Sequence, residues 1–272
     1  MHKIALELGP LTIHWYGVFV GLGCLLGLWS AARRGLREGL APERTYDFCW
    51  WILLGAVVGA RVWYVASYWS EDFADKSWLA VFNIRQGGLV FYGGVVGSSL
   101  ALILYSLLKR QPLWLLADIA TPSIALGSAL GRIGCLMTGC CYGSPCSLPW
   151  AIRFPEDHAT RHNPVHPVQI YDALINLALY LFLELSCFRR RRFDGQVFVV
   201  WLLIYPFTRS FTELFRGDYP QRYLGGSMTP AQAMSLFTVV AGVALYFLLP
   251  RRLTRRAESS DLAETDPVPP HG

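Results

Sequence analysis

Seven apolar segments constrain what this chain can fold into, because each is about 20 residues long and a helix of that length crosses the core of a bilayer. Their approximate bounds are Leu11–Ala31, Phe48–Trp69, Gly88–Leu108, Leu113–Leu130, Val168–Leu185, Val197–Phe215 and Thr229–Leu249. Only 16% of the 272 residues are charged, whereas a soluble domain carries about 25%. The sequence therefore predicts an all-α integral membrane protein with about seven transmembrane helices.

The predicted organisation is a single transmembrane domain over residues 1–256. Residues 257–272 are acidic and rich in proline, a composition that cannot bury enough apolar surface to fold. We therefore expect a disordered tail there. The longest hydrophilic insert covers residues 131–166 and is rich in Pro, Gly and Cys.

Basic residues indicate the orientation of the helices. Of the 24 Lys and Arg residues, fourteen follow the first, third, fifth and seventh apolar segments, and eight lie on the other side. Because Lys and Arg concentrate in cytoplasmic loops, we expect the N-terminus outside and the C-terminus in the cytoplasm. The net charge of +5 is then explained by topology and lipid headgroups, and no nucleic-acid partner is expected.

Ionisable residues inside a bilayer usually mark a site, since each costs a few kcal/mol to insert. Four lie deeper within the apolar segments, namely Arg61, Asp118, Arg209 and Glu213. Arg132 stands at the outer boundary of its segment, whereas Asp172 and Glu184 lie near the ends of theirs and carry less weight. Arginine binds phosphate through two parallel hydrogen bonds and stays protonated. The excess of arginine predicts a site for an anion such as a phospholipid headgroup, and an internal ion pair is the alternative.

Ordered motifs along the chain narrow this prediction. They are His14-Trp15-Tyr16-Gly17, Gly59-Ala60-Arg61, Gly87-Gly88-x-x-Phe91-x-Gly93-Gly94-x-x-Gly97, Asp118-x-x-x-Pro122, Gly131-Arg132-Ile-Gly, His166-Pro167-x-Gln169-x-Tyr171, Tyr205-x-x-x-Arg209-x-x-x-Glu213 and Ser227-Met228-x-x-x-Gln232. With this set, covering almost the whole chain in order, the sequence resembles the prolipoprotein diacylglyceryl transferase family of bacterial inner membranes.

The resemblance implies transfer of the diacylglyceryl group of phosphatidylglycerol to the lipobox cysteine thiol of a prolipoprotein. The product is a thioether and glycerol-1-phosphate leaves. The partners implied are phosphatidylglycerol, prolipoprotein signal peptides and the lipid bilayer, for a multi-pass protein of the bacterial inner membrane. Neither a cofactor nor a metal ion is expected. The candidate substrate-binding residues are Tyr16, Arg61, Gly93, Gly94, Gly143, Tyr205, Glu213 and His166.

Two departures from the family pattern concern the candidate catalytic residues, which are Tyr92, Arg132, Arg209 and Cys140. Tyr92 stands where the family has a histidine, and Cys135, Thr138 and Cys140 stand where it has two asparagines and a glutamate. A phenol with a pKa near 10 is a poor base unless nearby cations lower that pKa. Tyr92 is the candidate base, with a cysteine thiolate or His166 as alternatives. We interpret the chain as a divergent member that keeps lipid binding, and a different acceptor or a thiol and redox function is the alternative.

Four cysteines, Cys135, Cys140, Cys141 and Cys146, gather in the outer insert. Cysteines of the bacterial envelope tend to pair, so a disulfide is the preferred interpretation, with Cys141 and Cys146 the easiest pair. Thiols lining the pocket, a redox relay to a quinone, and zinc held with His158, His162 or His166 are the alternatives. The zinc interpretation lacks a Cys-x2-Cys pair.

Overall fold

The computed structural model describes residues 4–8, 11–74, 78–84, 87–218 and 229–264, and it confirms a mainly helical membrane protein. Six helical stretches within this part of the chain are long and apolar enough to cross a bilayer. They are Trp15–Arg37, Pro42–Ser67, Phe91–Lys109, Leu113–Thr138, Val168–Arg190 and Gln232–Leu249. Large apolar side chains are exposed along most of these helices, as expected of surfaces that face lipid.

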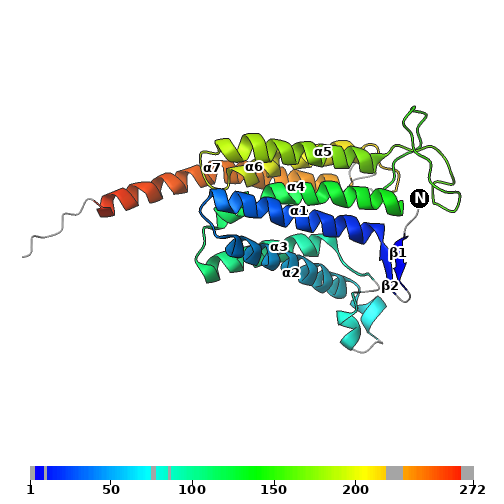
Figure 1. The fold of residues 1–272 in the computed structure, drawn as a ribbon, viewed down its shortest axis with the longest axis horizontal. Coiled ribbons are helices and arrows are strands. Elements are labelled where there is room, and N and C mark those ends of the chain that lie inside the picture. The colour runs from blue at the N-terminus through cyan, green and yellow to red at the C-terminus, as the bar shows by residue number, and fades with distance from the viewer. Residues whose placement is uncertain (1–3, 9–10, 75–77, 85–86, 219–228, 265–272) are drawn as a thin grey trace, which may run out of the picture. The chain divides into compact units, whose positions relative to one another are not determined.

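The elements follow one another as β1 (Ile4–Leu8), β2 (Leu11–His14), α1 (Trp15–Arg37), α2 (Pro42–Ser67), η1 (Trp69–Phe73), η2 (Trp78–Phe82), α3 (Phe91–Lys109), α4 (Leu113–Thr138), α5 (Val168–Phe182), η3 (Leu183–Cys187), η4 (Phe188–Arg190), α6 (Gln196–Glu213) and α7 (Pro230–Glu264) (Figure 1). They form two compact units. The first comprises Met1–Gly27 and Thr121–Gly272, and the second comprises Leu28–Ala120.

A β-hairpin precedes the first helix and corrects the predicted start of the first membrane segment at Leu11. Strands β1 and β2 pair antiparallel, with Ile4 opposite His14 and Leu8 opposite Leu11. Thr12 and Ile13 are β-branched and favour a strand. Helix α1 therefore begins at Trp15.

Helix α4 corrects a second boundary, since it continues past the predicted end at Leu130 to Thr138. Arg132 is therefore a helical residue and not the start of a hydrophilic loop. The residues after Gly131 are mostly apolar up to Thr138, and a strong break comes only at Gly139, whose φ is +80°. This extension places Arg132 and Cys135 on one helix.

Helix α6 corresponds to the predicted segment Val197–Phe215, contains Gln196, Arg209 and Glu213, and is not among the six spans above. The total of seven spans and the orientation of the termini stay predictions. Helix α7 runs to Glu264, past the boundary at residue 256 between membrane domain and tail, and that division also stays a prediction.

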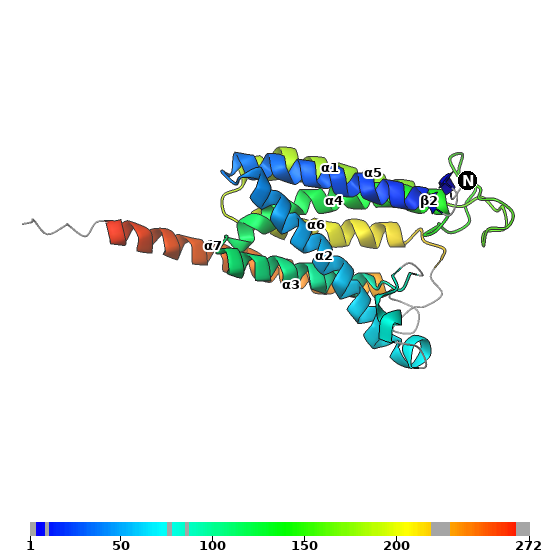
Figure 2. The same ribbon diagram turned by 60° about the horizontal axis from the view of Figure 1, so that its bottom comes forward.

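Glycines allow α2 and α3 of the second unit to pack closely, and both views show the two helices side by side (Figures 1 and 2). A Cβ on Gly59 would lie 2.7 Å from the Cα of Gly97, and a Cβ on Gly55 would lie 2.6 Å from the carbonyl oxygen of Gly97. Small residues spaced by four are typical of helices in close contact within membranes. The glycine-rich motif is thus first a packing surface.

In the first unit, α1 packs against α4. Ser123 donates a hydrogen bond of 2.7 Å to the carbonyl of Gly27, and a Cβ on Gly23 would lie 3.3 Å from the Cα of Gly127. At the end of the same face, a Cβ on Gly134 would lie 3.1 Å from the ring of Tyr16. The start of α1 is thereby fixed against the last turns of α4.

Candidate active site

A chain of ion pairs connects α4, α5 and α6 in the first unit. Nε of Arg132 on α4 lies 3.2 Å from Oδ2 of Asp172 on α5. The same oxygen lies 3.9 Å from Nη1 of Arg209 on α6. Nη2 of Arg209 lies 2.6 Å from Oε2 of Glu213, four residues further on, which is an internal ion pair of the kind considered as the alternative. Nη1 of Arg216 lies 3.9 Å from that same Glu213 oxygen.

The carboxylates of this network are almost completely buried, with 4% of the Asp172 side chain and 1% of the Glu213 side chain exposed. Against these two acids stand three guanidinium groups, so the buried part carries one excess positive charge before Asp218 is counted. Asp218 accepts two hydrogen bonds from Arg216, of 2.9 and 2.8 Å. Burial alone would lower the pKa of Arg216, but hydrogen bonding to Asp218 raises it above its ordinary value.

Arg132 keeps hydrogen-bonding capacity for a ligand. Its Nε is paired with Asp172, while its two terminal nitrogens make no hydrogen bond within the part of the chain that the structure describes, and 20% of the side chain is exposed. Two parallel N–H donors with fixed geometry match the oxygens of a phosphate. Asp172 holds the guanidinium group of Arg132 in place through its Nε atom.

Buried acceptors without donors lie on the helices around the network. They are Oε1 of Gln169, Oδ1 of Asn176 and Oε1 of Glu213, none of which has a hydrogen-bond partner among the described residues. A buried polar atom without a partner is costly. Such atoms are suited to accept hydrogen bonds from water or from hydroxyl groups of a ligand.

The turn after α4 brings the cysteines together. The N–H of Cys140 donates to the carbonyl of Cys135 at 3.1 Å, and the N–H of Gly139 donates to that of Leu136 at 3.3 Å. With the positive φ of Gly139 these bonds form a Schellman motif, the common way to end a helix. The motif folds the chain back, so that Cys140 lies beside the last turn of α4.

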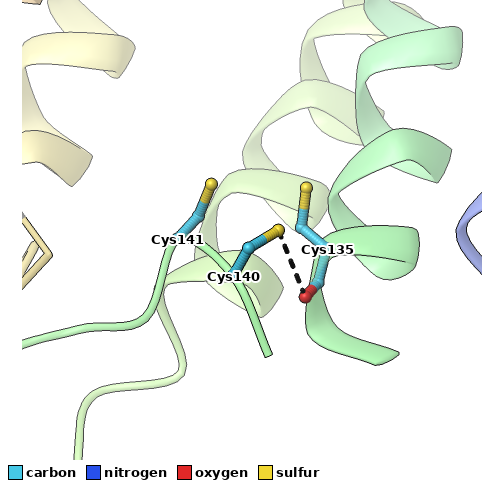
Figure 3. A group of neighbouring side chains, drawn as sticks. All are labelled: Cys135, Cys140 and Cys141. Carbon is cyan, nitrogen blue, oxygen red and sulfur yellow. Dashed lines mark hydrogen bonds between the residues drawn. The ribbon is translucent and has the colours of Figure 1, made fainter. Parts of the chain in front are cut away.

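Three thiols meet at this turn. The sulfur atoms of Cys135, Cys140 and Cys141 all lie within 4.8 Å of one another, and Figure 3 shows the Cys140 thiol directed at the backbone of Cys135, to whose carbonyl it donates at 3.7 Å. All three are free, as is Cys146, so the structure does not contain the predicted pair of Cys141 and Cys146. Hydrogen bonds from the thiols of Cys135 and Cys141 lower the pKa of Cys140.

The segment after the thiols is attached to the end of α6. Ser144 N donates to the carbonyl of Phe215 at 2.8 Å, and Gly217 N donates to that of Tyr142 at 3.1 Å. Gly143 lies between them, and a Cβ there would be 2.6 Å from the Cβ of His166. The candidate substrate-binding residue Gly143 is thus a point of close backbone approach that joins the thiol turn to the end of the ion-pair network.

The histidines of the outer insert are occupied by other contacts. Nε2 of His158 lies 2.8 Å from the carbonyl of Gly139, and Nδ1 of His162 lies 2.9 Å from that of Phe154. His166, a candidate substrate-binding residue, lies with Nδ1 3.4 Å from the hydroxyl of Tyr171. None of the three belongs to the thiol group, so the alternative of a zinc site built with these histidines is not found among the described residues.

Tyr16 and Tyr205 lie near the same centre. Tyr16 is within electrostatic range of the three thiols and of Arg132. Tyr205 is within that range of Arg132 and stacks on Trp201 with ring centroids 5.0 Å apart. Both tyrosines therefore lie near Arg132, and their roles in substrate binding stay predictions.

Arg61, a candidate substrate-binding residue, makes structural contacts in the second unit, and its role in binding stays a prediction. Its guanidinium donates to four backbone carbonyls of the second unit, those of Val81 at 2.7 Å, Ala80 at 2.9 Å, Gly88 at 3.0 Å and Gly87 at 3.1 Å. These bonds hold η2 and the two glycines before α3 to α2, beside a cavity of about 210 Å³. With its donors engaged in this way, Arg61 serves the fold before any ligand.

Tyr92, Gly93 and Gly94 occupy the first turn of α3 in the second unit. A Cβ on Gly93 would collide with the backbone of Gly59 and the side chain of Trp63, and one on Gly94 would lie 3.3 Å from the carbonyl of Ala56. Packing against α2 therefore accounts for Gly93. The catalytic role of Tyr92 and the binding roles of these glycines stay predictions.

Asp172 contributes more to the site than its place near the end of a segment predicts, and Arg216 and Asn176 were not among the predicted site residues. Asp172 was set aside as close to the end of its segment, yet it joins two arginines. A signal was available, because Gln169, Asp172 and Asn176 are spaced by three and four and form one polar stripe on an otherwise apolar helix.

These features define an integral membrane protein with a buried arginine and carboxylate network beside a group of thiols. The sequence matches the family described as prolipoprotein diacylglyceryl transferase over residues 3–248, and the chain belongs to that family.

Several relatives extend over nearly the whole chain. The phosphatidylglycerol–prolipoprotein diacylglyceryl transferase of Bacillus cytotoxicus is 33% identical over 267 residues, which cover 95% of both chains. That of Bacillus mycoides is 34% identical over 265 residues, again 95% of both. The enzyme of the same name from Trichormus variabilis is 32% identical over 251 residues, covering 89% of this chain and 87% of the relative.

Proposed function

We propose that this protein transfers the diacylglyceryl group of phosphatidylglycerol to the lipobox cysteine thiol of prolipoproteins. The observation that carries the proposal is the network in which Asp172 positions Arg132 and Arg209, leaving the terminal nitrogens of Arg132 available. In a member of this family, such a fork suits the phosphodiester of phosphatidylglycerol.

The proposed reaction forms one carbon–sulfur bond and breaks one carbon–oxygen bond. The acceptor thiolate attacks the glycerol carbon that carries the phosphate, and glycerol-1-phosphate departs with the electron pair of the broken bond. Negative charge grows on the phosphate oxygens as this bond breaks. Fixed guanidinium groups stabilise that charge without reorganising, which is the role proposed for Arg132 and Arg209.

Glu213 and Asp172 are proposed as positioning residues that hold these guanidinium groups. Tyr16, Tyr205 and His166 are proposed to contact the substrate, as are Gly94 and Gly143, where no side chain projects. Cys140 is proposed as a catalytic residue because its thiol is exposed and belongs to the group beside Arg132.

The base that removes the proton of the acceptor thiol has two candidates in this chain. Tyr92 is proposed on the strength of its place in the glycine motif. The group of Cys135, Cys140 and Cys141 is the second candidate because its thiols lie together beside Arg132. The transfer activity of Tyr92→Phe decides between the two candidates.

The proposed setting is the inner membrane of a bacterium, where prolipoprotein signal peptides and phosphatidylglycerol are both present. The segment outside the bilayer would receive the lipobox from the outer side, in line with the orientation expected from the basic residues. Nucleic acid has no place in this function.

Complementation tests the proposal directly. A bacterium depleted of its own transferase is supplied with this chain, and prolipoprotein modification is followed by gel mobility and mass spectrometry. We expect the precursor to gain a diacylglyceryl group, and Arg132→Ala to abolish the gain. If well-expressed, folded protein leaves the precursor unmodified while purified protein still binds phosphatidylglycerol vesicles, the acceptor is wrong.

A further inference from the structure

The three thiols at the end of α4 form a group that the proposed reaction does not by itself require. Cys135 comes from the last turn of the helix, and Cys140 and Cys141 come from the chain that returns beside it (Figure 3). Their sulfur atoms lie within 4.8 Å of one another. Sequence separation and helix geometry alone would not bring Cys141 there, so the backbone must be turned to do so.

The backbone is built to make this approach. Cys141 has a φ of +60°, a conformation that residues other than glycine adopt rarely and at a cost. Buried Gln169 donates a hydrogen bond of 2.8 Å to the carbonyl of Cys140, and His158 holds the carbonyl of Gly139 from the other side. The turn is thus fixed by neighbours in an arrangement that brings all three sulfurs within 4.8 Å of one another.

Three convergent thiols are the donor set of a thiophilic metal ion. Zinc binds cysteine sulfur at about 2.3 Å with tetrahedral geometry, which places the sulfurs about 3.8 Å apart. Sulfur atoms within 4.8 Å of one another reach that spacing by small side-chain rotations. Structural zinc sites have four protein ligands, whereas catalytic sites have three and an open position.

A fourth protein ligand is absent from the described residues around the group. Cys146 lies in the same insert but is not part of it, and the ring nitrogens of His158 are engaged by Gly139 and Thr160. The site therefore has the ligand count of an open zinc centre.

Charge around the group fits a zinc ion bound to thiolates. Three thiolates and one Zn²⁺ carry a net charge of −1. Cys141 is within electrostatic range of Arg132 and of Arg216, two cations that also pair with Asp172, Glu213 and Asp218. Cys140 is the exposed member, so the open position can be reached from outside.

We propose that Cys135, Cys140 and Cys141 bind Zn²⁺ and that the open fourth position binds the acceptor thiol of the transfer reaction. The identity of this thiol rests on the proposed function, whereas the metal site itself does not. A zinc-bound thiol is deprotonated outright. The metal would then replace the family histidine and glutamate, which are Tyr92 and Cys140 in this chain.

The step balances as follows. The acceptor sulfur binds Zn²⁺ and its proton passes to solvent water. That sulfur then forms a bond to the glycerol carbon of phosphatidylglycerol, and the carbon–oxygen bond to phosphate breaks. Glycerol-1-phosphate leaves with the electron pair, and the neutral thioether, a poorer ligand than a thiolate, leaves the metal.

Metal content of the full-length protein tests the site. The chain is purified in detergent under reducing conditions, loaded with ZnCl₂ or CoCl₂ alone, and freed of excess metal. We expect one equivalent of metal per chain, and for Co²⁺ the intense near-ultraviolet absorption of cobalt–thiolate bonds. Cys140→Ser and Cys141→Ser should weaken metal binding by more than about 100-fold, since even changes around the ligands cost about 10- to 100-fold.

Cys146→Ser is the matched control, because it removes a thiol of the same insert that lies outside the group, and it should keep the full equivalent. Metal retained by both Cys140→Ser and Cys141→Ser would overturn the site, as would a wild-type protein with no bound metal. A disulfide among the three cysteines in the purified, metal-loaded protein would also overturn it. Thermal unfolding of each variant shows that it is folded.

The open position has its own test. A lipobox peptide is added to the Co²⁺ protein, with a peptide carrying serine in place of the cysteine as control. A change in the cobalt spectrum with the cysteine peptide alone supports a thiol in the fourth position, and no change overturns this part. A spectral change without transfer from phosphatidylglycerol would refute the proposed function and leave the metal site standing.

Discussion

Nε of Arg132 lies 3.2 Å from Oδ2 of Asp172, so a guanidinium of α4 is held by a carboxylate of α5 of which only 4% is exposed. The contact fixes one edge of the arginine and leaves the other for a ligand. Because the same carboxylate also lies 3.9 Å from Arg209, a single acid sets the spacing of two cations on different helices.

Replacing Asp172 by Asn should therefore impair both arginines. The amide cannot balance the buried charge, and loss of one partner of such a pair costs about 2–5 kcal/mol. We expect kcat/KM for phosphatidylglycerol to fall by about 10- to 100-fold. Asp157→Asn, at an exposed acid of the outer insert, is the control, and equal activity of the two variants would remove Asp172 from the site.

Arg209→Lys keeps the charge but removes the planar fork. A lysine ammonium cannot make two parallel hydrogen bonds to a phosphate. Transfer should fall by about tenfold or more, equivalent to at least about 1.4 kcal/mol of transition-state stabilisation. Initial rates with vesicles of phosphatidylglycerol measure this, and a fully active Lys variant would make Arg209 a charge-balancing residue only.

Glu213→Gln should be milder than Arg209→Ala. The amide oxygen can still face the Arg209 guanidinium, whose Nη2 lies 2.6 Å from Oε2 of Glu213, although the buried positive charge is then less well balanced. The two variants are compared in the same rate assay, together with thermal unfolding. A larger loss in Glu213→Gln would mean that the carboxylate itself takes part in the reaction.

Gly59→Ala should destabilise the protein, because the new methyl group would lie 2.7 Å from the Cα of Gly97. Overpacking of this kind costs about 1–3 kcal/mol, or a lowering of Tm by about 2–10 °C. Gly127→Ala is the matched control, since nothing lies within 4 Å of a Cβ at that helical position. Equal Tm values in detergent would show that α2 and α3 are not packed through glycine.

Tyr92→Phe distinguishes the two ways of removing the thiol proton. If the phenol is the base, this variant loses transfer but keeps lipid binding, and Tyr92→His retains activity. If Zn²⁺ activates the thiol, no phenol is needed, and we expect turnover within about twofold of the wild type. Transfer to a lipobox peptide measures both, and abolished transfer with intact Co²⁺ binding would assign the base to Tyr92.

The seven apolar segments of the sequence predicted much of the fold. Helices α1 to α7 correspond to the seven apolar segments, and the pair of Arg209 and Glu213 is the internal ion pair that was the alternative to an anion site. The start of α1 was missed because Leu11–His14 is as apolar as the helix it precedes, so hydropathy cannot separate strand from span. The end of α4 was missed because Arg132 resembles a boundary, although its charge is met by Asp172.

The geometry of the site depends on contacts that cannot be predicted from the spacing of residues along the sequence. Arg61 is an intramembrane charge like Arg209, yet its partners are carbonyls of a segment about twenty residues away in sequence. The thiol group arises from the turn at Gly139 and the positive φ of Cys141, and neither follows from the order of the cysteines. Both depend on how the backbone folds back on itself.

The hydrogen bonds from Arg61 to η2 also bear on the depth of the second unit in the bilayer. Trp78 and Phe82 of η2 are 70% and 71% exposed, and Arg61 on α2 binds the carbonyls of Ala80 and Val81 between them. Aromatic rings prefer the level of the lipid headgroups. Because Arg61 binds η2 to α2, the two rings cannot shift along the membrane normal without α2. Their preference for the headgroup level therefore sets the depth of α2 in the bilayer.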